Sequence, residues 1–240
     1  MRCTIPEGPE VKKFGESLAS VISMQDLIDV KILSGRYQKN GLDKLTEFKE
    51  NLPVKVVGPG VHGKFLYWIL DNNWTLWNTL GMTGSWSPEK RKHSRIEFVF
   101  SDRSVFFNDQ RNFGTIKLVE NRMFLVEKLK SLGPDMLSED VDNQIFLEKI
   151  KGCKKKTITQ ALMDQSVIAG VGNYLKSESL YLSGISPHRT CDTLSDEELE
   201  KLNACIKKVI RDAYASGGAT IQSYSDFNNE IGEYSQKFSV

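Results

Sequence analysis

The sequence predicts an α+β fold of two domains, in which an N-terminal helix and an antiparallel β-sandwich are followed by a helical domain. Three observations predict it. Apolar residues recur at helical spacing near the N-terminus, short β-rich stretches fill the chain from about residue 27 to residue 119, and helical spacing returns after residue 121. We place the first domain at residues 1–121 and the second at residues 122–240.

The first element follows two prolines, Pro6 and Pro9, which suit the first turn of a helix. Apolar side chains then recur three or four residues apart, at Val11, Phe14, Leu18, Val21 and Ile22. This spacing places them on one face and predicts an amphipathic helix.

The β-rich region consists of short stretches separated by turn residues such as Pro59-Gly60, Asn72-Asn73 and Asp102-Arg103. The stretches are Val30 to Leu33, Val54 to Val57, Phe65 to Leu70, Trp74 to Leu80, Ile96 to Phe100, Val105 to Phe107 and Thr115 to Val119. Their number and spacing are typical of an antiparallel sandwich or barrel.

Helical spacing characterises the second half of the chain. It covers Phe124 to Leu132, Gln144 to Ile150, Thr157 to Met163 and Ser195 to Tyr214. A hinge between the halves is expected at Leu132 to Asp135, because Gly133-Pro134 stops a helix.

Composition bounds the class of protein. Hydrophobic residues make up 40% of the 240, enough for a real core, and neither a membrane-spanning run nor a signal peptide is evident, so we expect a protein that works inside a cell. The four cysteines are scattered at Cys3, Cys153, Cys191 and Cys205, without a C-x-x-C pair. We therefore expect reduced packing cysteines, with no metal site and no cofactor.

The formal net charge of +1 does not by itself predict a polyanionic partner. Basic residues nevertheless gather in two short segments, residues 90–95 and 149–156. These segments predict either a basic face for a nucleic acid or an ordinary solvated surface.

The segment from Pro6 to Val11 is the first that suggests chemistry. A free secondary amine on proline could attack C1′ of a damaged nucleotide, displace the base and form a Schiff base, and a position at a helix N-terminus disfavours its protonation. Glu7 would supply the proton transfers. Taken alone, the segment also fits a proline-initiated helix with an acidic first turn.

Further motifs follow in order. They are His62 to Leu66, Leu80 to Gly84, Asp109 to Gly114, Leu132 to Asp135, Leu162 to Glu178 and Ser216 to Thr220. Together with the first segment they resemble the formamidopyrimidine-DNA glycosylase / endonuclease VIII family over nearly the whole chain. The resemblance implies that Leu162 to Glu178 forms a helix-two-turns-helix.

The resemblance implies a bifunctional glycosylase and apurinic/apyrimidinic lyase that removes oxidised bases, purine or pyrimidine, from duplex DNA as a monomer. Pro6 would be the Schiff-base nucleophile, Glu7 the proton donor and acceptor, and Lys64 a phosphate contact that assists elimination.

Four other residues would bind DNA. Met82, Arg111 and Phe113 would fill the void left by an everted base, since apolar wedges and a planar guanidinium suit that task. Asn173 would open a helix whose free N–H groups favour a phosphate. Considered singly, Lys64 fits a surface lysine, Met82 and Phe113 fit core packing, and His62 is expected to be structural.

Three departures from the family pattern qualify this prediction. Residues precede Pro6, and an internal proline nitrogen is an amide that cannot act as a nucleophile, so we expect exposure by cleavage after Ile5 or by initiation at that position. The C-terminal zinc-finger hairpin is expected to be missing, and Thr79 replaces a histidine common in relatives.

The alternative function is that of a DNA- or lesion-binding relative without catalysis. A helical scaffold without a DNA role is a more distant alternative.

Overall fold

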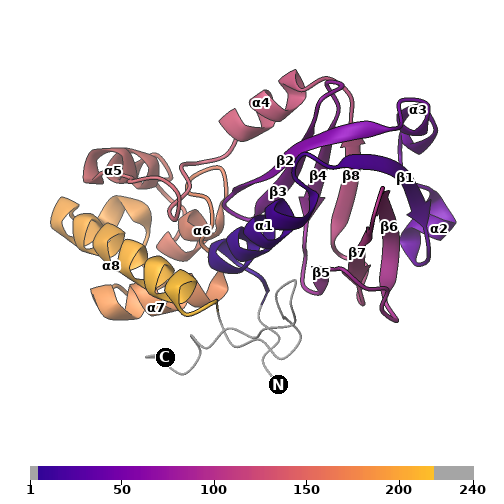
Figure 1. The fold of residues 1–240 in the computed structure, drawn as a ribbon. Helices are drawn as coiled ribbons and strands as arrows, with labels where there is room; N and C mark the ends of the chain where they lie inside the picture. Colours follow the sequence, from indigo (N-terminus) through magenta and orange to yellow (C-terminus); the bar gives the residue numbers. More distant parts are fainter. Residues whose placement is uncertain (1–4, 219–240) are drawn as a thin grey trace.

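The computed structural model describes residues 5–218. A β-sheet part and a helical part lie at opposite ends of the molecule, with helix α1 (Gly8–Ile22) near their junction (Figure 1). This arrangement confirms the predicted α+β fold. Cys3, the end of the Ser216 to Thr220 segment and the expected position of the C-terminal hairpin lie outside the described residues.

Helix α1 begins where its sequence favours a start. Glu7 is the N-cap residue, Pro9 occupies the first turn, and the side chain of Glu10 accepts a 2.8 Å hydrogen bond from the Glu7 N–H in a capping box. The helix buries the predicted apolar face through Val11, Phe14, Leu18 and Ile22. Packing this face against β2 joins the helix to the sheet.

The described residues form eight antiparallel strands in the order β5-β7-β6-β1-β2-β3-β4-β8. They are β1 (Asp26–Ile32), β2 (Val54–His62), β3 (Phe65–Leu70), β4 (Thr75–Thr79), β5 (Gly84–Ser87), β6 (Ser94–Phe100), β7 (Ser104–Asp109) and β8 (Thr115–Val119). Seven match predicted stretches. Strand β5 was not predicted, because its four residues, with serines at two of them, carry too short an alternation.

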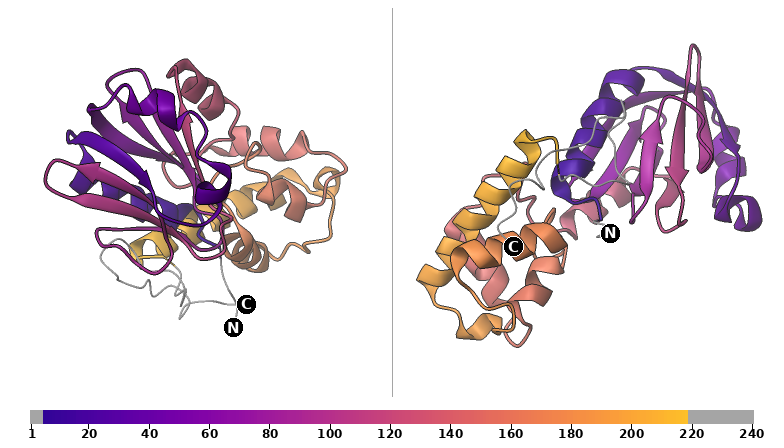
Figure 2. Two further views of the ribbon diagram at one scale, coloured as in Figure 1. Left: turned by 90° about the vertical axis from the view of Figure 1, so that its right-hand side faces the viewer. Right: turned by 90° about the horizontal axis from the view of Figure 1, so that it is seen from below.

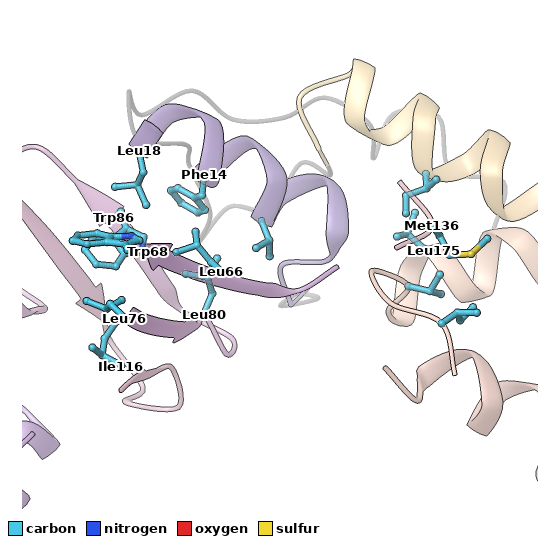
Figure 3. Close-up of a cluster of buried hydrophobic side chains, with 14 of the residues drawn as sticks. Phe14, Leu18, Leu66, Trp68, Leu76, Leu80, Trp86, Ile116, Met136 and Leu175 are labelled. Atoms are coloured by element: carbon cyan, nitrogen blue, oxygen red, sulfur yellow. The ribbon is translucent and has the colours of Figure 1, made fainter. Parts of the chain in front are cut away.

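The sheet bends so that its two halves face each other. Aromatic side chains from strands that are not neighbours in the sheet therefore meet in the core. The ring of Trp68 on β3 lies 5.0 Å from those of Trp86 on β5 and Phe98 on β6. Figure 3 shows Trp68 and Trp86 together with Phe14 and Leu18 of α1. A single sheet thus encloses its core as the predicted sandwich would.

Two short helices between β1 and β2, α2 (Arg36–Asn40) and α3 (Leu45–Lys49), were also not predicted. Each has only five residues, which is too short for a helical period to be recognised. Helix α2 contacts the loop between β7 and β8 and the start of β8.

The helical part contains the predicted helices, including the one expected to begin at Asn173, and a short 3₁₀ turn. Its elements are α4 (Met123–Lys130), α5 (Asn143–Lys151), α6 (Ile158–Met163), α7 (Asn173–Ser183), the 3₁₀ turn η1 (Cys191–Thr193) and α8 (Asp196–Ala215). Its core includes Met136 and Leu175, which lie apart from the tryptophan cluster (Figure 3). None of the helices in the described residues is long and apolar enough to span a bilayer.

The two parts meet along α1 and α8, which lie near each other in the view from below (Figure 2). There the hydroxyl of Tyr214 on α8 donates a 2.6 Å hydrogen bond to Glu16 on α1. The start of α1 therefore faces the helical part, and this placement creates the candidate site.

Candidate active site

The start of α1 meets the start of α7, although the two lie far apart in sequence. The Glu7 carboxylate accepts hydrogen bonds from the N–H groups of Gly172 at 2.7 Å, Tyr174 at 2.8 Å and Leu175 at 3.3 Å. A carboxylate at this position is stabilised by the unpaired N–H groups and the dipole of a helix N-terminus.

These contacts correct one expectation. The sequence predicted that the helix beginning at Asn173 would present free N–H groups to a phosphate, but three N–H groups around this helix start bind Glu7 instead. The reason is tertiary: α1 supplies an anion from the same chain. Asn173 itself is exposed, and its side-chain oxygen accepts a 2.7 Å hydrogen bond from Lys176 Nζ.

Gly172 allows the two halves to approach closely. A Cβ atom there would lie 2.3 Å from Glu7 Cδ and 2.6 Å from Lys64 Nζ, both shorter than real contacts. Its backbone is extended, so the turn does not require glycine, and the space beside Glu7 and Lys64 favours it. The same measurement places Glu7 and Lys64 side by side at the interface.

A second buried acid stands behind the first. Glu10 accepts the Glu7 N–H through one oxygen and the Tyr174 hydroxyl, at 2.9 Å, through the other. Both carboxyl groups are almost fully buried. The Glu7 backbone and the first turn of α7 are thereby fixed to the same side chain.

Burial is the main influence on the pKa of the Glu7 carboxyl group. It raises the pKa of Glu7 to about 7, with Glu10 also raising it, while Lys64 and the N–H groups of Tyr174 and Leu175 lower it. Burial likewise lowers the pKa of Lys64, against the opposing effect of Glu7 and Glu10. A carboxyl with a pKa near neutrality can both give and take a proton at physiological pH.

The turn that carries Lys64 is held by the helical part. The Gly63 N–H donates a 3.0 Å hydrogen bond to Asp135, and His62 Nε2 lies 2.8 Å from the Gly133 carbonyl oxygen. Gly63 has a φ of +58°, and a Cβ there would lie 2.6 Å from the Gly170 nitrogen. The Leu132 to Asp135 segment thus connects the two parts, and His62 has the structural contact expected of it.

Pro6 is buried directly before Glu7, whereas Ile5 is 42% exposed. In the chain as described, the Pro6 nitrogen forms the amide bond with Ile5, so it has no lone pair available for attack.

A second group of predicted residues lies on two adjacent loops of the sheet. Arg111 and Phe113 occupy the loop between β7 and β8, where the guanidinium carbon lies 4.9 Å from the centre of the Phe113 ring. Met82 lies in the β4 to β5 turn, and a Cβ at the neighbouring Gly81 would come within 2.8 Å of the Gly114 nitrogen. The structure therefore brings the three predicted void-filling residues onto contiguous loops.

Asp109 holds these two loops together. One of its oxygens accepts the Thr83 hydroxyl at 2.5 Å and the Arg111 N–H at 3.2 Å, and the other accepts the Gly114 N–H at 2.7 Å. Asp109 is buried, while Phe113 remains 55% exposed. The buried Asp109 carboxylate thus fixes the backbone of the loop that carries the exposed Phe113 ring.

Sequence reasoning assigned no role to four residues of these networks: Glu10, Asp109, Asp135 and Tyr174. All four fall within motifs that the sequence did single out. The available signal was a polar side chain inside a family motif, and the partners of these residues could be named only once the fold joined distant segments.

The described residues do not fit a zinc site. Among them, no three His, Cys, Asp or Glu side chains come together as metal ligands would. The three described cysteines, Cys153, Cys191 and Cys205, are free.

A sheet domain, a helical domain and an acid–lysine site at their junction define a two-domain protein of the helix-two-turns-helix class. Residues 5–116 match the family model for the formamidopyrimidine-DNA glycosylase N-terminal domain, and residues 132–225 match the model for the H2TH domain of the same glycosylase. The chain belongs to the formamidopyrimidine-DNA glycosylase family.

Individual relatives agree with this assignment. A formamidopyrimidine-DNA glycosylase from Oceanobacillus iheyensis is 32% identical over 98% of this chain and 86% of its own length. The crystal structure of the MutM (Fpg) protein from Thermus thermophilus superposes with a TM-score of 0.87 at 28% identity, covering 98% of this chain and 86% of that one. A Lactococcus lactis Fpg variant in complex with DNA containing Fapy-dG gives a TM-score of 0.84 at 26% identity, covering 98% and 88%.

Proposed function

We propose that this protein is a base-excision-repair DNA glycosylase with apurinic/apyrimidinic lyase activity, which removes oxidised bases through a Schiff base on Pro6. The observation that carries the proposal is the meeting of Glu7 and Lys64 at Gly172, directly after a buried Pro6. An acid with a pKa near 7 and a neighbouring cation are the groups that such a reaction needs beside its nucleophile.

In the proposed reaction, a free Pro6 amine attacks C1′ of the damaged nucleotide. The N–C1′ bond forms, the bond from C1′ to the base breaks, and the base leaves with the electron pair. The proline nitrogen gives up its proton, and the departing base takes up one proton. The C1′–O4′ bond then opens, and protonated Glu7 donates its proton to O4′, leaving an iminium cation between Pro6 and C1′. Glu7, now a carboxylate, accepts a C2′ proton, the C2′–C3′ double bond forms, and the C3′–O bond breaks to expel the 3′-phosphate, which Lys64 contacts.

The exposed loops would bind the rest of the duplex. Met82 and Phe113 would enter the stack, Arg111 would face the orphaned base, and the exposed side chain of Asn173 would hold a phosphate. Solved relatives support damaged duplex DNA as the partner, since Lactococcus lactis Fpg has been crystallised with DNA containing Fapy-dG or an AP site. We propose that the protein acts as a monomer, with its domain boundary between residues 121 and 122.

One observation favours a second candidate function. The Pro6 nitrogen is acylated by Ile5 in the chain as described, which leaves the DNA-binding loops complete but the nucleophile blocked. In that state the protein would recognise lesions without excising them. Catalysis would require a free Pro6 amine. Cleavage of the Ile5–Pro6 bond would supply it, and so would translation that begins at the Ile5 position.

Borohydride trapping on a duplex with an oxidised base distinguishes the two functions. It should be run on the chain beginning at Met1, on a chain whose initiator methionine is removed to leave Pro6 first, and on that shorter chain carrying Pro6→Gly and Glu7→Gln together. We expect a covalent adduct from the Pro6-first chain, little from the longer chain, and severely reduced trapping from the double variant. Binding without an adduct by the Pro6-first chain would favour the non-catalytic function.

A further inference from the structure

Arg95 on β6 holds the loop that carries Arg111 and Phe113. Its Nε donates a 2.7 Å hydrogen bond to the carbonyl oxygen of Asp109, and one terminal nitrogen lies 3.3 Å from the carbonyl oxygen of Gln110. These are the two peptide groups that immediately precede Arg111. The guanidinium therefore fixes the direction in which the loop leaves β7.

Arg95 is itself held from the other side. Its second terminal nitrogen donates a 2.9 Å hydrogen bond to the Ser34 hydroxyl, which in turn donates to the Ser94 carbonyl at 2.7 Å. The neighbouring Gly35 has a φ of +76°, and a Cβ there would lie 2.8 Å from Arg95 Cδ and 2.4 Å from the Asn112 side chain. Arg95 and the loop thus pack against Ser34 and Gly35, which directly follow β1.

Helix α2 adds a second support. A terminal nitrogen of Arg36 lies 3.5 Å from the Asn112 carbonyl oxygen, and the Tyr37 hydroxyl accepts the Ile116 N–H at 2.7 Å. The middle of the loop, at Asn112, and strand β8, which follows the loop, are therefore joined to the segment after β1.

The loop conformation needs such support. Asn112, between Arg111 and Phe113, has a φ of +57°, in the left-handed region that asparagine adopts more readily than most side chains do. A residue stays in this region when surrounding contacts over-determine it, and such residues cluster at functional sites.

We propose that Arg95 is a positioning residue that sets the place of Arg111 and Phe113, and through them the recognition of the orphaned base. The inference rests on the proposed function and deepens it. Arg95 does not contact DNA in this scheme, because all three nitrogens of its half-buried guanidinium point at Ser34 and the loop carbonyls. Its sequence neighbourhood, the basic segment 90–95, suggested a nucleic-acid face or solvated surface, and neither describes this side chain.

The geometry distinguishes positioning from simple charge. A lysine at residue 95 would keep the positive charge but could not reach Asp109, Gln110 and Ser34 with a planar fork. Arg95→Lys should therefore behave like Arg95→Gln if position matters, and like the unchanged protein if charge matters. Arg103→Gln is the matched control, because Arg103 is exposed in the turn at the other end of β6 and β7 and pairs with Asp102.

The first test needs no DNA. Hydrogen exchange at the amides of Arg111 and Gly114, which donate to Asp109, reports the order of the loop in the free protein. We expect exchange about tenfold faster in Arg95→Gln and Arg95→Lys, with Arg103→Gln unchanged. Unchanged exchange in both Arg95 variants would overturn the proposal.

The second test measures binding to two duplexes, one intact and one with a tetrahydrofuran abasic analogue opposite cytosine. We expect both Arg95 variants to lose about tenfold of the preference for the abasic duplex, as Arg111→Ala should, while binding to the intact duplex changes less than about twofold. A preference retained by either Arg95 variant overturns this inference alone. No preference in the unchanged protein would overturn it together with the proposed function.

Discussion

The two groups of candidate residues differ in how the fold presents them. Glu7 and Lys64 lie at the junction of the two parts, where Glu7 is buried among charges and backbone N–H groups and Lys64 is partly buried. Arg111 and Phe113 lie on a loop at the end of the sheet, with the phenylalanine ring half exposed and its support provided by backbone contacts.

The difference follows from the tasks proposed for them. A proton donor needs an environment that shifts its pKa, and burial beside other ionisable groups supplies it. A side chain that enters a DNA stack must be accessible before binding, so only its backbone can be fixed. Substitutions at the junction should therefore change stability and chemistry together, whereas substitutions at the loop should change DNA binding alone.

The largest effect is expected from Glu7→Gln in a chain that begins at Pro6. Removing the proton donor and acceptor should slow single-turnover base excision about 10²- to 10⁴-fold, while affinity for an abasic-analogue duplex changes less than about threefold. Glu47→Gln, on the exposed helix α3, is the control and should leave both quantities unchanged. Excision at the normal rate would show that Glu7 is only a helix cap.

The pH dependence of stability tests the burial of the same group. The pKa of Glu7 is raised from 4.5 to about 7 in the folded protein, so the stabilisation from its protonated form is complete below pH 4.5 and is lost as the pH rises through 7. The free energy of unfolding, relative to that of Glu7→Gln, should fall by about 3 kcal/mol between pH 4.5 and pH 8. Urea denaturation at several pH values measures it.

The opposite pH dependence would show that burial is not the dominant influence on the pKa of Glu7. If stability relative to Glu7→Gln rose with pH, the N–H groups and dipole of α7 would outweigh burial and favour the carboxylate. The sign of the slope therefore decides which of the two effects controls this group.

Gly172→Ala tests the close approach of the two parts. The new Cβ would overlap Glu7 and Lys64, and the resulting shift should lower the free energy of unfolding by about 1–3 kcal/mol and also reduce borohydride trapping in the Pro6-first chain. Gly152→Ala at the end of α5 is a matched control, since its Cβ would meet nothing closer than 3.3 Å. Equal effects of the two substitutions would argue against a tight junction at Gly172.

The same contrast explains what the sequence could predict. Strands such as β3 and helices such as α1 carry strong periodicity, and their bounds were close to those observed. Strand β5 and helices α2 and α3 are four or five residues long, so no period can be recognised in them. The bend that makes one sheet act as two layers depends on contacts between β3 and β6, which no local pattern contains.

The candidate site was predicted as a set of residues but not as a geometry. Family motifs named Glu7, Lys64 and Asn173, yet the binding of Glu7 to the start of α7 joins residues 165 or more positions apart. Arg95 shows the limit most clearly, because its residue type and neighbours suggested surface charge. Its contacts to Asp109, Gln110 and Ser34 depend on the pairing of β6 with β7 and on the path after β1.

The smallest effect on stability is expected from Phe113→Ala. Because the ring is 55% exposed, its removal should change the free energy of unfolding by less than about 0.5 kcal/mol. Loss of stacking should nevertheless weaken binding to an abasic-analogue duplex by about 1–3 kcal/mol. Phe124→Ala on α4, where the ring is 51% exposed, controls for the loss of an exposed aromatic ring and should leave binding unchanged. Equal binding by the two variants would show that Phe113 does not contact DNA. A large loss of stability in Phe113→Ala would show that its ring is part of the folded core.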